Sequence, residues 1–177
     1  MNIVYLLLYA IAVVVVGFVM VKTYLEKDIM NRKVLISLTL TMICIVSYSV
    51  NFMTDNYNIM SAATSIMMVA QDFLLVTLFI YTTAFTRIRN KVTKVMTIAS
   101  FALALVDSVV FIVNIFNEIA LKYSLVKCDG IYVLGYEGEL WFGIHAVMSM
   151  LIVAFIIAVL VIKCIRIPGA YLSLIHI

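Results

Sequence analysis

The stretch SAATSIMMVAQDFLLVTLFIYTTAF, residues 61–85, contains 25 residues and a single charge, the carboxylate of Asp72. A helix rises about 1.5 Å per residue, so a helix of this length crosses the roughly 30 Å hydrocarbon core of a bilayer. A carboxylate inside such a segment is costly in lipid and normally faces protein or a water-filled cavity. The stretch therefore predicts a membrane-crossing helix that carries one acid with a function.

The rest of the chain has the same character. Of 177 residues, 66% are hydrophobic and 12% are charged, and the mean hydropathy of +1.21 lies far outside the range of soluble proteins. A transmembrane β-barrel would require an alternation of polar and apolar residues that these runs lack. We expect an all-α fold, a polytopic transmembrane helical bundle with five spans at about residues 3–21, 34–53, 61–85, 95–117 and 141–162.

The basic residues predict the orientation of the bundle. Ten of the twelve Lys and Arg residues lie in the first loop, in the third loop or after the last span. Cytoplasmic loops carry an excess of Lys and Arg, so we expect an outside N-terminus and a cytoplasmic C-terminus in a bacterial cell membrane. We attribute the net charge of +3 to the basic residues of these cytoplasmic loops and not to nucleic-acid binding. The expected partner is therefore the lipid bilayer, and no nucleic acid is expected.

The outer loop, residues 118–140, is the only sizeable segment outside the predicted spans. Within it, the runs 124–128 and 131–134 flank Asp129-Gly130, a dipeptide that suits a tight type I′ turn. This pattern predicts a small hairpin over the bundle, with an ordinary polar connector as the alternative.

Polar residues recur at helical spacing within the spans. Asp72 and Asp107 lie about 16 Å and 15 Å from the outer ends of their spans at 1.5 Å per residue, and His145 lies one turn below the surface. These stripes converge on a cavity open to the outside, although Ser, Thr and Asn also form plain helix–helix seams. A lone Trp at a span end is also typical of a membrane-interface anchor. The candidate ligand-sensing residues are Asp72, Asp107, Gln71, Asn51, Asn114, His145 and Trp141.

Several functions lack their sequence signals. The chain has no nucleotide-binding glycine pattern and no metal-type spacing. Its three cysteines lie at different predicted depths, so we expect no disulfide between them. We therefore expect no catalytic residue, no metal, no cofactor and no enzymatic activity in this chain.

The most specific pattern accompanies the last span. Gly138, Trp141, Phe142 and His145 precede or begin it, and Pro168 and Tyr171 follow it. This arrangement resembles the N-terminal seven-transmembrane input region of bacterial sensor histidine kinases and diguanylate cyclases, with one extra residue between the glycine and the aromatic pair. The resemblance implies a sensory function for residues 1–171, two further spans, and a cytoplasmic output domain through which a homodimer could form.

The last six residues, Leu-Ser-Leu-Ile-His-Ile (172–177), resemble the translation of a sequencing-library adapter. We expect this tail to be non-native and the chain to be a fragment without its output domain. The predicted function is that of a sensory input region that binds an unknown extracellular or membrane-soluble ligand in an outward-facing cavity. The alternative is a small transporter or channel subunit, although the chain shows no internal repeat and no proline within a span.

Overall fold

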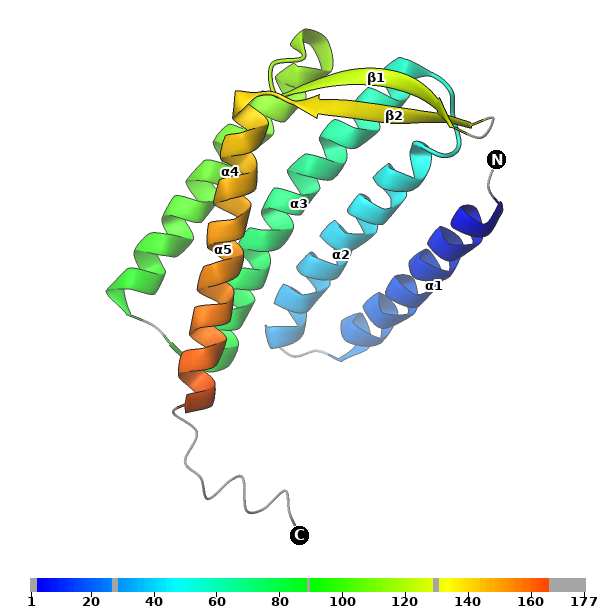
Figure 1. Cartoon of the computed structure of the whole chain (residues 1–177). Coiled ribbons are helices and arrows are strands. Elements are labelled where there is room, and N and C mark those ends of the chain that lie inside the picture. The colour runs from blue at the N-terminus through cyan, green and yellow to red at the C-terminus, as the bar shows by residue number, and fades with distance from the viewer. Residues whose placement is uncertain (1–2, 27–28, 89, 129–130, 166–177) are drawn as a thin grey trace.

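A computed structural model describes residues 3–26, 29–88, 90–128 and 131–165. These residues form an all-α bundle with one short β-hairpin (Figure 1). All five helices are long and apolar enough to cross a membrane. In lipid, every backbone N–H and C=O must be satisfied internally, and helices achieve this within one segment. The helices are α1 (Ile3–Leu25), α2 (Ile29–Val50), α3 (Tyr57–Thr86), α4 (Lys91–Asn117) and α5 (Leu140–Ile165).

The five predicted spans are confirmed as helices, and each helix extends beyond the predicted bounds at one or both ends, whereas the second also ends earlier than predicted. α2 ends at Val50, and residues 51–53 form a turn. The amides of Asn51, Phe52 and Met53 each donate to the carbonyl three residues earlier. Such bonds tighten the last turn of a helix and satisfy carbonyls that would otherwise lack partners.

The outer surface of the helices confirms a membrane protein. Phe18 is 72% exposed and Phe116 is 81% exposed, and large apolar side chains are exposed along every helix. Soluble monomers rarely leave apolar patches of this extent in water. Hydrocarbon is the solvent that suits such a surface, as expected for a protein whose helices are long and apolar enough to cross a membrane.

α3 is the central helix of the bundle. It packs against α2, α4 and α5, while α1 packs against α2 at the edge. Ser37 on α2 donates a hydrogen bond of 3.2 Å to Thr77 on α3, and Asn51 donates one of 3.2 Å to Thr64. The polar stripe of α2 therefore forms a seam with α3.

The predicted hairpin is confirmed and lies across one end of the bundle (Figure 1). Strands β1 (Leu121–Cys128) and β2 (Ile131–Gly138) pair antiparallel from Leu121↔Gly138 to Cys128↔Ile131. They are longer than the sequence suggested, and the expected turn residues Asp129 and Gly130 lie outside the described residues.

The hairpin is held to the bundle by polar contacts. Asn114 at the end of α4 is fully buried and accepts hydrogen bonds from the amides of Ala120 (2.6 Å) and Leu121 (2.9 Å). Its amide nitrogen donates to the Leu121 carbonyl at 3.2 Å. The hydroxyls of Ser65 and Tyr123 lie 3.2 Å apart, which ties β1 to α3. β2 leads directly into α5, so the hairpin sets where α5 begins.

Candidate functional site

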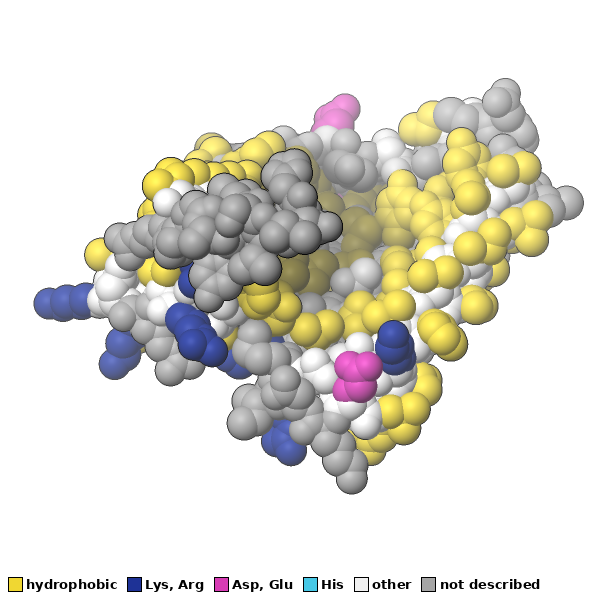
Figure 2. Space-filling model, turned by 90° about the horizontal axis from the view of Figure 1, so that it is seen from below, with side chains coloured by type: hydrophobic (Ala, Val, Ile, Leu, Met, Phe, Trp, Pro, Cys, Tyr) yellow, Lys and Arg dark blue, Asp and Glu magenta, His cyan; other side chains and the backbone are white. Residues whose placement is uncertain are grey.

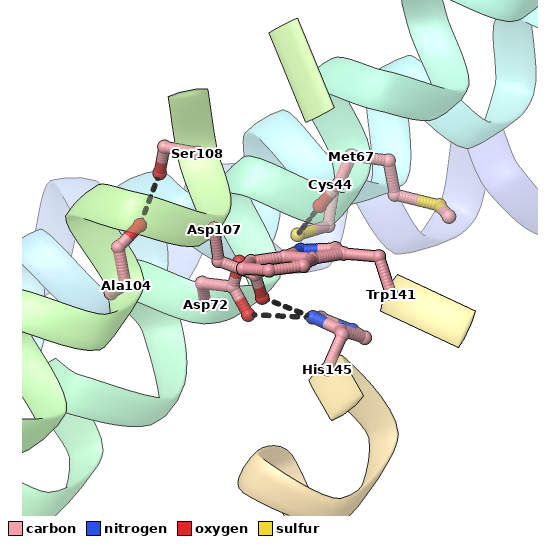
Figure 3. A network of polar contacts seen from close by, with 8 residues as sticks. All are labelled: Cys44, Met67, Asp72, Ala104, Asp107, Ser108, Trp141 and His145. Atoms are coloured by element: carbon pink, nitrogen blue, oxygen red, sulfur yellow. Dashed lines mark hydrogen bonds and ion pairs between the residues drawn. The ribbon is translucent and has the colours of Figure 1, made fainter. Parts of the chain in front are cut away.

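Two carboxylates and an imidazole meet between three helices at the centre of the candidate site. Asp72 comes from α3, Asp107 from α4 and His145 from α5 (Figure 3). The His145 Nδ1 lies 2.6 Å from Asp107 Oδ2 and 3.3 Å from Asp72 Oδ1. One ligand atom of each side chain lies within 4.8 Å of the others. The two acids that the sequence singled out are therefore neighbours, and a single histidine contacts both.

Asp107 is held in one orientation. Its Oδ1 accepts a hydrogen bond of 2.7 Å from the indole Nε1–H of Trp141, and its Oδ2 contacts His145. Trp141 and His145 are four residues apart on α5, so they share one face of that helix. This face of α5 supplies two groups to one carboxylate, and Trp141 is thus part of the site.

Asp72 is paired less completely. Its side chain is 8% exposed, and among the described residues its Oδ2 has no hydrogen-bond partner. An unpartnered buried carboxylate oxygen is costly, because it has lost water and gained nothing in return. Oδ2 of Asp72 can therefore accept a further hydrogen bond or bind a cation.

Aromatic rings fix the position of the histidine. The Phe111 ring meets the His145 ring edge-on at 5.0 Å between centroids, and Phe142 stacks on it at 5.9 Å. Phe111 is four residues after Asp107 and Phe142 is three residues before His145, so both share the helical face of a site residue. Neither ring is among the candidate residues predicted from the sequence, although this helical spacing from Asp107 and His145 was the available signal.

Gly138 leaves room for Phe142 at the junction of β2 and α5. A Cβ atom at position 138 would overlap the Phe142 ring, whereas one at Gly143 would meet no atom within 4 Å. The glycine, the aromatic pair and the histidine of the quoted sequence pattern thus form one contiguous arrangement. Pro168 and Tyr171 lie outside the described residues, as does the 172–177 tail.

A small pocket of about 60 Å³ opens beside the cluster. Its walls are mostly apolar, with side chains of α4 and α5 among them. This volume exceeds what one water molecule requires. The polar side chains that line it are Asp72, Ser100, Asp107, Trp141, His145 and Ser149.

The other candidate residues lie elsewhere. Gln71 is exposed and does not line the pocket. Asn51 bonds Thr64 in the α2–α3 seam, and Asn114 holds the hairpin through three backbone groups. Of the seven candidates, the structure brings together Asp72, Asp107, Trp141 and His145.

No family model, curated protein or solved structure matches this chain. The chemistry of the site therefore rests on its own geometry. With both acids ionised and the imidazole protonated, the three groups would carry a net charge of −1 in a largely apolar surrounding. Buried charges persist when they are paired or coordinate an ion. The cluster is thus suited to accept one more positive charge or a strong hydrogen-bond donor.

Proposed function

We propose that this chain is the membrane-embedded sensory input region of a bacterial signal-transduction protein, located in the cytoplasmic membrane. The pocket beside Asp72, Asp107 and His145 is its ligand site. The observation that carries the proposal is the incompletely paired Asp72 carboxylate in a cluster built from three helices. Ionisable groups inside membrane spans are expensive and usually mark function.

The position of the cluster supports a switching role. Its three members come from α3, α4 and α5, and α5 reaches from the hairpin to the opposite end of the bundle (Figure 1). A ligand that neutralises Asp72 would change the attraction between α3 and α5. A ligand shifts a helix arrangement by as much as its affinity differs between the two arrangements. In this proposal α5 carries the shift to a cytoplasmic output domain of the histidine kinase or diguanylate cyclase type.

The first prediction tests this role in membranes that contain the protein with its output domain. Asp72→Asn keeps the size of the side chain and removes its charge, so the output should no longer follow the stimulus while membrane insertion is normal. The matched control is Asp55→Asn, because Asp55 is exposed and lies outside the cluster. An unchanged stimulus response in the double variant of Asp72→Asn and Asp107→Asn would refute the proposal.

The same cluster supports the transporter alternative, because transporters hold coupling ions near the middle of the membrane. A flux assay separates the two functions. Proteoliposomes that contain the purified chain should show no solute or proton uptake above empty vesicles if the chain is a sensor. Uptake that Asp72→Asn abolishes would favour the transporter.

A further inference from the structure

We propose that Asp72, Asp107 and His145 bind a divalent first-row transition-metal ion. This inference deepens the proposed function, since it names the chemical class of the ligand. Carboxylate oxygens and imidazole nitrogen are established ligands of ions such as Zn²⁺ and Mn²⁺. The sequence alone predicted no metal site, because the three residues are too far apart along the chain to form a recognisable metal-binding spacing.

The distances suit such an ion. In a tetrahedral site with bonds of about 2.1 Å, neighbouring ligand atoms lie about 3.4 Å apart. The two contacts of His145 Nδ1, 2.6 Å to Asp107 Oδ2 and 3.3 Å to Asp72 Oδ1, are shorter than this value, and the three ligand atoms all lie within 4.8 Å of one another. Side-chain adjustments of about an ångström would therefore complete three bonds.

A second observation that points to a ligand is Oδ2 of Asp72, which has no hydrogen-bond partner among the described residues. It belongs to a side chain that is more than nine-tenths buried, and the residue lines the pocket. A metal bond would give a carboxylate of this kind the partner that the described residues do not supply. Two carboxylates and a neutral imidazole would balance a divalent ion, leaving no net charge in the bundle.

The neighbouring residues are arranged as supports for metal ligands. Trp141 holds Oδ1 of Asp107 and leaves Oδ2 to face His145, while Phe111 and Phe142 fix the imidazole ring. Such supporting contacts orient ligands and raise metal affinity. The pocket provides space for a fourth ligand such as water. Ca²⁺ favours six to eight oxygen ligands and Mg²⁺ near-octahedral oxygen sites, so both suit this mixed set less well.

The test uses the purified chain in detergent after treatment with a chelator. Calorimetric titration with Zn²⁺ and with Mn²⁺ should show one ion per chain, and Mg²⁺ should bind at least about 10-fold more weakly. Asp72→Asn should lower Zn²⁺ affinity by more than about 10-fold, because loss of even a supporting contact costs 10- to 100-fold. Trp141→Phe, which removes the bond to Asp107, should cause a loss within that range.

Thermal unfolding shows whether each variant is folded. Without metal, Asp72→Asn should melt at or above the wild-type temperature, because it removes a buried charge whose Oδ2 has no hydrogen-bond partner among the described residues. Saturating Zn²⁺ should raise the melting temperature of the wild type and of the Asp55→Asn control but not that of Asp72→Asn. An unchanged Zn²⁺ affinity of the Asp72→Asn variant would overturn the proposed site. Loss of Zn²⁺ binding in Cys164→Ser would also overturn it, because the ion would then bind at the exposed Cys164 thiol.

Different results would refute the metal site and the sensory role. Absence of Zn²⁺ and Mn²⁺ binding to the wild type overturns the metal site even where Asp72→Asn abolishes signalling. Binding that depends on Asp72 supports the metal site even where the output of Asp72→Asn still follows the stimulus.

Discussion

At the scale of single residues, Asn114 has the clearest structural role. Its side chain satisfies two amides and one carbonyl at the start of the hairpin, and the side chains of Ala120 and Leu121 beside it are fully buried. Asn114→Ala would leave these groups without partners, at about 1–3 kcal/mol each. We expect faster hydrogen exchange at the Ala120 and Leu121 amides and a lower melting temperature.

Asn117→Ala is the matched control, because Asn117 lies in the same last turn of α4 and is exposed. It should leave both the exchange rates and the melting temperature unchanged. If both variants exchanged at equal rates, the hairpin would be held by its apolar contacts rather than by Asn114.

The two acids of the site could be predicted because each is a lone charge in an apolar run. Gln71 was a poorer choice for a physical reason: consecutive residues of a helix point about 100° apart, so a neighbour of Asp72 faces another direction. His145 appeared shallower than the acids because depths counted from helix ends do not align one helix with another. Only the packing of α5 on α3 places its ring against both carboxylates.

At the scale of elements, the junction between β2 and α5 connects the hairpin to the site. Gly138→Ala would force the Phe142 ring away from its position and disturb its stacking on His145. Overpacking of this kind costs about 1–3 kcal/mol. We expect a lower melting temperature and a shifted fluorescence emission from Trp141, the only tryptophan of the chain.

Gly143→Ala provides the comparison, since a Cβ atom there meets no atom within 4 Å. This variant should melt at or above the wild-type temperature, because alanine favours helix more than glycine does. A Gly138→Ala protein with wild-type stability and emission would show that Phe142 has another position open to it.

The hairpin itself was foreseeable from the Asp-Gly dipeptide between two β-prone runs, and its longer strands were not. Residues 121–123 extend β1 because Tyr123 reaches Ser65 and because Leu121 is buried at the end of the bundle. These contacts join residues about 60 positions apart in the sequence, so a pattern of neighbouring residues cannot predict them. The pocket has the same origin, because its lining combines residues of α4 and α5 with Asp72 of α3.

At the scale of the whole molecule, the five helices were predictable because bilayer thickness dictates span length. The basic segments gather at one end of this bundle. The α1–α2 and α3–α4 connections and the end of α5 lie opposite the hairpin (Figure 1), and Figure 2 shows Lys and Arg side chains around that face. The bundle thus has a basic end and a hairpin end. Such a difference in Lys and Arg content between the two ends sets the orientation of a protein in the membrane.

The last prediction concerns which end faces the cytoplasm. Reporter fusions after Lys33 and Lys94 should read cytoplasmic, because these residues belong to the basic loops that resist translocation. A fusion between Lys122 and Gly138 should read external, on the side where the pocket beside Trp141 would meet its ligand. Replacing Lys91 and Lys94 by Gln tests whether the basic residues set this orientation. The replacement should weaken the cytoplasmic signal of the third loop without changing the helices. An external signal at Lys94 in the unaltered chain would invert the bundle and place the hairpin, and with it the near end of the site, on the cytoplasmic side.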